Sequence, residues 1–186
     1  NKKSCNLATI GCTSFFPTKP LGCYGDGGAC FTNNKDLAEK IRRISLHGQK
    51  RRYFHTDIGI NGRIDTIQAA ILLAKLEFFD YEIKTRQKLG EFYSEQLNSI
   101  GIKNTPHILP NNTSVFAQYT IQINDREIFQ KELQKFGIPT AIHYPTILPL
   151  QPALNSSNNF EGEKNDYKNA YYSSQKVLSL PFHPWL

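Results

Sequence analysis

A single lysine enclosed by two prolines and followed by four glycines constrains the fold of this chain more than any other feature. The stretch runs from Ser14 to Gly28 and reads SFFPTKPLGCYGDGG. Proline fixes its own φ and pushes the preceding residue out of the helical region, so Lys19 is predicted to lie outside any helix. The glycines permit a tight reversal with φ above zero, or a backbone that passes close to another group. The stretch is therefore predicted to be a loop that holds one amine in place.

The length and composition are those of an ordinary globular protein of one or two small domains. The chain has 186 residues, 39% of them hydrophobic, and a mean hydropathy of −0.45. We find no apolar run long enough to cross a membrane and no convincing signal peptide, so a cytoplasmic location is expected. Methionine is absent throughout. The sequence is therefore interpreted as a segment of a longer protein.

Charge and cysteine content argue against nucleic-acid binding and against a metal site. The net charge is +6 and the isoelectric point about 9.1, but the densest basic run is only Lys50–Arg52. Positive residues spread in this way indicate a solvated surface. The four cysteines all lie within the first thirty residues, at spacings that match no paired CxxC motif. Reduced, partly buried thiols and no metal are the preferred interpretation.

The first half of the chain predicts a strand, a loop, a second strand and then helices. Residues 4–16 are predicted to be a buried strand, and ACFTN after the glycines the returning strand. A helix capped by Asn33 or Asn34 then follows, and Gly48 is its predicted C′ residue. The other predictions here are a helical face of Leu37, Ile41 and Ile44, a loop over residues 49–62, and a helix over residues 63–100 broken near 79–82, with Ile64, Ile67, Ile71, Ala74 and Phe78 on one stripe.

The second half predicts a small α+β unit. Residues 115–123 alternate in polarity and are predicted to form a half-buried strand. Asn124 or Asp125 caps the next predicted helix, which ends at Gly137. The remaining predictions are core positions for Ile128, Phe129, Leu133 and Phe136, a short strand over residues 140–143, a polar mobile stretch over residues 155–166, and a last helix over residues 167–178.

Three motifs together carry a resemblance to a known family. SFFPTKPLGCYGDGGA, GINGRIDTIQAAIL and HYPTILPLQPAL, in this order and spacing, resemble the DegT/DnrJ/StrS sugar aminotransferases. Within that family the motifs are most similar to enzymes that aminate UDP-linked 3-keto-2-acetamido-hexuronic acids for bacterial surface polysaccharides such as O-antigen. The resemblance implies an α/β chain with the fold-type I, aspartate aminotransferase-like architecture, pyridoxal 5′-phosphate as cofactor, and a homodimer with shared active sites.

The resemblance also implies a domain division. Residues 1–78 would be the C-terminal part of the large cofactor-binding domain, and residues 79–186 the small C-terminal domain. In this fold the aspartate that pairs with the pyridinium nitrogen and the phosphate-binding turn lie upstream of the lysine, and neither is found here. The chain is therefore expected to be the C-terminal half of the enzyme.

Three residues are implied to serve the cofactor. Lys19 would form the Schiff base with pyridoxal phosphate, a role that needs a neutral, well-held amine and so agrees with the predicted loop. Ser14 would donate to the cofactor phosphate; a buried serine bonded to backbone is the alternative. Asn61, in the GINGR segment, would reach the phosphate of the neighbouring subunit's cofactor.

Three more residues are implied to serve the substrate. Arg63 would bind the sugar carboxylate, because its planar fork suits bidentate pairing. A cation at the start of a helix opposes the helix dipole, which also indicates a use beyond folding. His143 and Tyr144 would approach the bound sugar, although a lone histidine is more often structural.

We therefore expect the full-length protein to transfer an amino group from glutamate to the keto sugar, with Lys19 as general base and acid. A sugar dehydratase of the same fold is the nearest alternative, and it would carry histidine in place of Lys19. A non-catalytic remnant or interaction module is the alternative from another class. A nucleic-acid-binding protein would need a basic patch with interleaved aromatic residues, which the spread of charge does not provide.

Overall fold

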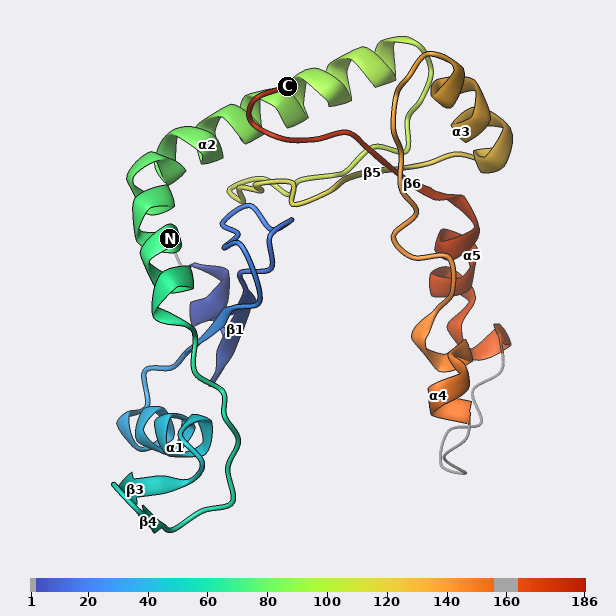
Figure 1. The fold of residues 1–186 in the computed structure, drawn as a ribbon. Helices are drawn as coiled ribbons and strands as arrows, with labels where there is room; N and C mark the ends of the chain where they lie inside the picture. Colours follow the sequence, from blue (N-terminus) through green and yellow to red (C-terminus); the bar gives the residue numbers. More distant parts are fainter. Residues whose placement is uncertain (1–2, 156–163) are drawn as a thin grey trace. The chain divides into compact units, whose positions relative to one another are not determined.

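The computed structural model describes residues 3–155 and 164–186. The chain divides into two compact units, Asn1–Asp80 and Tyr81–Leu186. Both units combine helices with small antiparallel sheets (Figure 1), as expected of an α/β chain. The assignment of residues 1–78 and 79–186 to the large and small domains of an enzyme stays a prediction.

The first unit begins with a strand, a loop and a returning strand. After a short 3-10 helix, η1 (Ser4–Asn6), β1 (Gly11–Ser14) pairs antiparallel with β2 (Gly28–Phe31). Cys12 lies opposite Cys30, and their Sγ atoms are 3.7 Å apart in free thiols. The prediction of a buried strand over residues 4–16 is wrong in length and in burial. Along β1 half-buried residues alternate with exposed ones, so only one face of the strand is covered. In the described residues β1 pairs with β2 alone.

Helix α1 (Lys35–Ser45) follows β2 and is capped as predicted at its start. The side chain of Asn34 accepts a hydrogen bond from the backbone N–H of Leu37 at 3.1 Å. The helix ends one residue earlier than predicted, because His47 rather than Gly48 occupies C′ with a φ of 60°. Gly48 comes next, with a φ of 73°, and its N–H donates to the carbonyl of Arg43.

Residues 49–62 contain a hairpin where a loop is predicted. Strands β3 (Gln49–Arg51) and β4 (Phe54–His55) pair antiparallel. Tyr53 turns the chain between them with a φ of 62°. The segment is polar and exposed, so it shows no burial period from which strands could be predicted.

Helix α2 (Thr66–Ser99) is continuous, so the predicted break near residues 79–82 is wrong. It begins three residues after Arg63, which therefore lies outside the helix. The predicted stripe is also wrong in part: Leu72 is buried, whereas Ile67 and Phe78 are 69% and 62% exposed. Apolar residues occur on several sides of this helix, so periodicity alone cannot identify the buried face.

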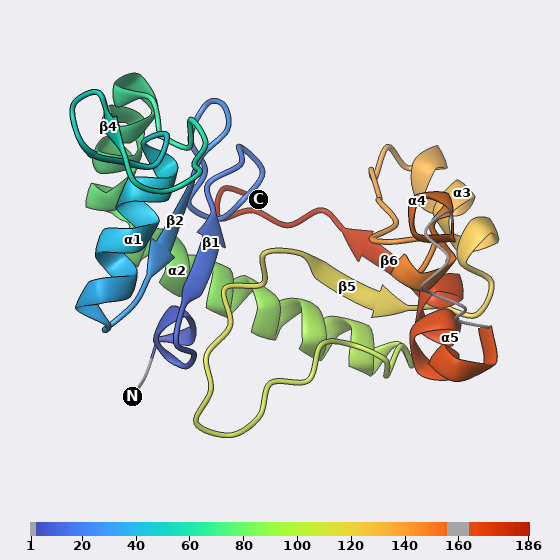
Figure 2. The ribbon, with the colours of Figure 1, turned by 90° about the horizontal axis from the view of Figure 1, so that it is seen from below.

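The second unit is built around the strand pair β5 (Tyr119–Gln122) and β6 (Val177–Leu180) (Figure 2). Strand β5 is shorter than predicted, because Phe116 has a φ of 44°, outside the extended region that a strand requires. Strand β6 replaces the end of the predicted last helix. No strand forms over residues 140–143, where Ala141 makes an isolated bridge to Ser179.

The core of the second unit lies on one face of these strands. Tyr119, Ile121 and Leu178 are fully buried, and Phe116 packs with them. The Tyr119 and Phe182 rings stack with centroids 5.6 Å apart. Gly90 allows this packing from within α2, because a Cβ at that position would overlap the Phe116 ring. The alternation predicted for Tyr119 and Ile121 is confirmed.

Short helices complete the second unit. Helix α3 (Arg126–Lys135) ends as predicted: Gly137 has a φ of 71°, and Ile138 and Gly137 donate to the carbonyls of Leu133 and Gln134. Phe129 and Leu133 pack on the core, whereas Ile128 and Phe136 are exposed, contrary to prediction. The others are η2 (Leu148–Leu150), α4 (Pro152–Asn155), η3 (Lys164–Tyr167) and α5 (Lys168–Lys176). Most of the predicted mobile stretch, residues 156–163, lies outside the described residues.

Candidate functional site

The loop between β1 and β2 carries Lys19 at a turn. The backbone N–H of Lys19 donates to the carbonyl of Phe16 at 2.8 Å, which closes the turn around Pro17. At the base of the loop, the N–H of Phe15 donates to the carbonyl of Gly27 at 2.8 Å. Lys19 therefore lies outside any helix, as the flanking prolines predict.

The glycines of this loop act through close approach and not through positive φ. None of positions 22, 25, 27 and 28 has a positive φ, so that part of the prediction is wrong. A Cβ on Gly22 would lie 2.5 Å from the carbonyl oxygen of Pro17 and 2.8 Å from that of Phe16. Because it has no side chain, Gly22 lets the backbone that follows Lys19 pack directly against the backbone of Phe16 and Pro17.

Side chains from outside the loop fix it in place. The N–H of Tyr24 donates to Oε1 of Gln68 at 2.8 Å, and Nζ of Lys75 donates to the carbonyl of Gly22 at 2.6 Å. Lys75 also lies over the Tyr24 ring, 4.7 Å from its centroid. Within the loop, the fully buried Cys23 thiol donates to the carbonyl of Phe15. Gln68 and Lys75 were not predicted to contact the loop. Their polar side chains within an otherwise apolar helical stretch could have indicated such a contact.

Lys19 and Ser14 present free donor groups on this scaffold. In the described part of the chain, the Lys19 amine has no hydrogen-bond or ion-pair partner, and its side chain is exposed. The Ser14 hydroxyl accepts a 3.2 Å hydrogen bond from the N–H of Phe16, which leaves its own proton available to donate. An amine and a hydroxyl donor therefore lie on the same strand-and-turn segment.

Asn61 and Arg63 contact each other on the segment that leads into α2. Nε of Arg63 donates to Oδ1 of Asn61 at 2.9 Å, and both residues are exposed. The carbonyl is therefore occupied, while the Asn61 amide group keeps its N–H donors and the Arg63 guanidinium keeps its Nη groups. Backbone bonds hold the segment to the end of α1, from Gly62 to Ser45 at 2.9 Å. These contacts present one amide and one cation side by side.

An ion pair supports the same segment from α1. Nε of Arg43 lies 3.0 Å from Oδ2 of Asp57, and both side chains are partly exposed. The hydrogen bond from Arg43, aided by one from Thr56, lowers the pKa of the Asp57 carboxyl. Asp57 accepts charge-assisted hydrogen bonds just before the segment with Asn61 and Arg63. We therefore assign it a structural role in holding that segment to α1, and no catalytic role.

His143 and Tyr144 belong to the second unit. Nδ1 of His143 lies 2.9 Å from the hydroxyl oxygen of Ser179, and the imidazole is half-buried. Tyr144 is 68% exposed, and its ring meets the His143 ring edge to face at 5.4 Å. Ser179 was not among the predicted site residues; it lies in β6, whose first two residues were predicted to end a helix.

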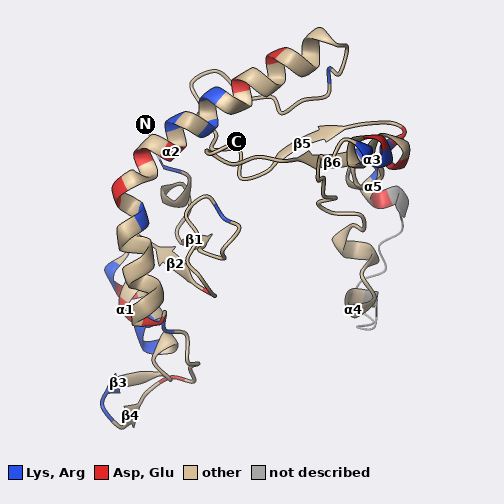
Figure 3. Cartoon of the chain, turned by 45° about the horizontal axis from the view of Figure 1, so that its top comes forward, with Lys and Arg blue, Asp and Glu red and all other residues tan. Residues whose placement is uncertain are grey.

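Among the described residues, no group of three or more His, Cys, Asp or Glu side chains lies close enough together to hold a metal ion. No described helix is both long and apolar enough to span a membrane. Helices α1 and α2 each carry both basic and acidic residues (Figure 3).

Comparison with known proteins gives consistent matches over the chain. The model of the DegT/DnrJ/EryC1/StrS aminotransferase family matches residues 1–186. The UDP-2-acetamido-2-deoxy-3-oxo-D-glucuronate aminotransferase of Pseudomonas aeruginosa is 52% identical over 185 residues, which is 100% of this chain and 50% of that protein. The chain spans about half the length of the curated relatives it matches.

Solved structures agree with the sequence matches. A DegT DnrJ EryC1 StrS aminotransferase from Brucella abortus superposes with a TM-score of 0.85 at 41% identity, covering 96% of this chain and 47% of that one. NtdA from Bacillus subtilis, solved with the bound cofactor PMP, gives a TM-score of 0.81 at 26% identity, covering 95% of this chain and 42% of that one. The fold predicted from the three motifs is confirmed.

Proposed function

We propose, from the premise that the chain belongs to the DegT/DnrJ/EryC1/StrS aminotransferase family, that its full-length protein transfers an amino group to a nucleotide-linked keto sugar. The substrate proposed is a UDP-linked 3-keto-2-acetamido-hexuronic acid, and the amino donor is glutamate. The observation that carries this proposal is the 52% identity, over the whole chain, to the UDP-2-acetamido-2-deoxy-3-oxo-D-glucuronate aminotransferase. We further propose a cytoplasmic homodimer that serves the synthesis of surface polysaccharides such as O-antigen.

The chemistry of the donor set supports pyridoxal 5′-phosphate as the cofactor. The cofactor offers an aldehyde and a phosphate. For the aldehyde, Lys19 offers an amine that has no partner in the part of the chain that the structure describes, and for the phosphate Ser14 offers a hydroxyl proton. The Asn61 amide N–H groups could also serve a phosphate. When bound, pyridoxal phosphate supplies the electron-accepting ring that makes amino-group transfer possible. The residues present therefore fit the cofactor.

The residues of the lysine loop would hold and move protons. Lys19 Nζ would bond the cofactor at rest and, once released, accept a proton from the donor amino acid and return it. The hydrogen bonds that Gln68 and Lys75 make to the loop backbone would hold Lys19 in the same position during these steps. Lysine at this position supports a transaminase over the dehydratase alternative, which would carry histidine.

The residues proposed for the substrate would orient it. Arg63 would bind the sugar carboxylate through its Nη groups, since its Nε is already held by Asn61. His143 and Tyr144 would contact the sugar nucleotide. Asn61 and Arg63 are proposed to serve the active site of the neighbouring subunit.

The test is product analysis with the full-length enzyme. We expect incubation with glutamate and the UDP-linked keto sugar to give a product whose mass matches replacement of the ketone by an amine. The neutral keto sugar UDP-N-acetyl-3-dehydroglucosamine is the matched control and should react more slowly. No amination of either sugar would contradict the proposed function and favour a non-catalytic role.

A further inference from the structure

A chain of two hydroxyl groups leads from His143 to a pocket on the second unit. Nδ1 of His143 lies 2.9 Å from Oγ of Ser179, and that oxygen lies 2.8 Å from Oγ1 of Thr120. Ser179 is only 5% exposed, so its hydroxyl exchanges little with solvent. The three side chains therefore form one continuous hydrogen-bonded relay.

The backbone places the three residues for this contact. Thr120 lies opposite Ser179 in the β5–β6 pair, on the face away from the core residues Tyr119 and Ile121. Ser179 also exchanges two backbone bonds with Ala141, of 2.7 and 3.1 Å. Its backbone thus holds the chain two residues before His143, while its side chain holds the imidazole. Ser179 thus holds the backbone at Ala141 and the imidazole ring of His143.

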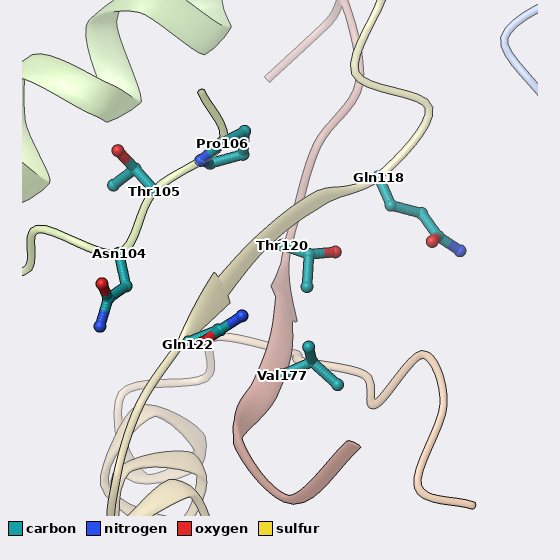
Figure 4. Close-up of a pocket in the computed structure, with 7 residues that line it drawn as sticks. All are labelled: Asn104, Thr105, Pro106, Gln118, Thr120, Gln122 and Val177. Carbon is teal, nitrogen blue, oxygen red and sulfur yellow. The ribbon is translucent and has the colours of Figure 1, made fainter. Parts of the chain in front are cut away.

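The other end of the relay opens onto a pocket of about 430 Å³. Figure 4 shows Thr120 and Gln122 on β5 together with the remaining lining residues: Asn104, Thr105, Pro106, Gln118 and Val177. The lining holds amides and hydroxyls but no charged side chain. Water in such a pocket can either donate to or accept from the Thr120 hydroxyl.

This arrangement satisfies the imidazole in either protonation state. With neutral Nδ1 as acceptor, Ser179 donates to it and receives a bond from Thr120. When Nδ1 carries a proton, it donates to Ser179, which then donates to Thr120. Because hydroxyls both donate and accept, no buried group loses its partner when the direction reverses. Nδ1 stays occupied in both cases, and Nε2 is the ring nitrogen left for a ligand.

We propose that Ser179 and Thr120 are positioning residues, which hold Nδ1 of His143 so that Nε2 is presented to the sugar nucleotide. The inference rests on the proposed function, in which His143 contacts the substrate. Neither hydroxyl touches substrate in this scheme. Their loss should therefore weaken use of the sugar more than the reaction with glutamate, because His143 is proposed to contact the sugar nucleotide.

The test follows the two half-reactions of the full-length enzyme by cofactor absorbance. Ser179→Ala should raise the KM for the keto sugar roughly two- to tenfold, the usual effect of one lost hydrogen bond. Thr120→Val should have a smaller effect in the same direction, and Thr120→Ser should restore the wild-type KM. The glutamate half-reaction is the internal reference. Equal losses in both half-reactions would overturn the inference.

A matched control separates positioning from stability. The Ser94 hydroxyl donates to the carbonyl of Gly90 at 2.8 Å, and its oxygen lies 2.7 Å from the Tyr119 hydroxyl oxygen; neither contact involves a residue of the relay. Ser94→Ala should lower Tm and leave the KM for the keto sugar unchanged. A KM shift in Ser94→Ala equal to that in Ser179→Ala would show that any weakening of this unit has the same effect, and would overturn the inference.

A double-mutant cycle gives the decisive outcome. In the background of His143→Ala, Ser179→Ala should add no further change in KM, because the group it positions is gone. A full effect in that background would overturn the inference, while amination of the sugar by the wild-type enzyme would leave the proposed function standing. No amination by the wild type would overturn both.

Discussion

At the scale of single residues, Lys19 combines an exposed amine, which has no partner among the described residues, with a backbone fixed by a turn. We predict that full-length enzyme bonds pyridoxal phosphate through this residue and absorbs in the visible. Borohydride should then fix the cofactor to the peptide that contains Lys19. Lys19→Ala should lower transamination by about 10²- to 10⁴-fold, the range for loss of a positioned base. Recovery of the label on another lysine would contradict the assignment.

Arg63 is the residue proposed to select an acidic sugar. Its Nε bond to Asn61 orients the guanidinium and leaves the Nη groups free for a carboxylate. Arg63→Ala should raise the KM for the uronic acid roughly ten- to a hundredfold, the loss of a charge-assisted contact of about 1.5–3 kcal/mol. Arg63→Lys should restore only part, because an ammonium lacks the fork.

The two half-reactions distinguish this role from a structural one. Arg63→Ala should change the glutamate half-reaction much less than the sugar half-reaction, when both are followed by cofactor absorbance. The neutral keto sugar is the matched substrate control, since it has no carboxylate to lose. Equal damage to both half-reactions would show that Arg63 serves the cofactor or the fold.

At the scale of elements, the lysine loop depends on contacts that are distant in sequence. Gln68 and Lys75 bond to loop residues 44 and 53 positions away. We predict that Gln68→Leu and Lys75→Met lower the affinity for pyridoxal phosphate roughly two- to tenfold each, as expected for one hydrogen bond. Leu76→Met is the control, since Leu76 is 48% exposed and makes neither bond. Cofactor titration by absorbance is the measurement; unchanged affinity in both variants would contradict an anchoring role.

Local features were predictable from the sequence, and features set by pairing were not. The Asn34 cap, the Gly137 helix end and the Lys19 turn depend on neighbouring residues, and all three are present. Strand β6 was missed, because Val177–Leu180 becomes a strand by pairing with β5, more than fifty residues earlier. The anchors of the lysine loop were missed for the same reason. The predicted break in α2 rested on the length of the helical pattern alone. Residues 79–82 contain no Pro or Gly to interrupt the helix, and α2 runs through them.

The Arg43–Asp57 pair links α1 to the segment before Asn61 and predicts a dependence on pH. Because the pKa of Asp57 is lowered in the folded state, its contribution to stability is present above the ordinary aspartate pKa of about 3.9. That contribution is lost as the pH falls through the lowered pKa. Asp57→Asn should therefore lower Tm of the full-length enzyme at pH 7, with the difference vanishing in acid. Glu132→Gln, which removes an exposed i,i+3 pair, is the control. A Tm difference that persists unchanged in strong acid would contradict the ion-pair explanation.

At the scale of the whole molecule, the 186-residue chain leaves many large apolar side chains uncovered. Ile58 is 98% exposed, Phe136 80% and Tyr53 79%. Strands β1 and β2 pair only with each other in the described residues, so their outer edges are open to other strands. Monomeric soluble proteins rarely expose apolar surface on this scale without a partner to cover it.

We therefore predict that residues 1–186 alone aggregate and neither bind pyridoxal phosphate tightly nor catalyse transamination. Lys19 and Ser14 would be present, but the fold offers them few further groups to hold the cofactor, and exposed edges and apolar faces favour association between copies. Light scattering after size exclusion, with cofactor absorbance on the same sample, is the measurement, and full-length enzyme at equal concentration is the control. A monomeric chain that melts cooperatively and binds the cofactor would show that these two units are sufficient for the site.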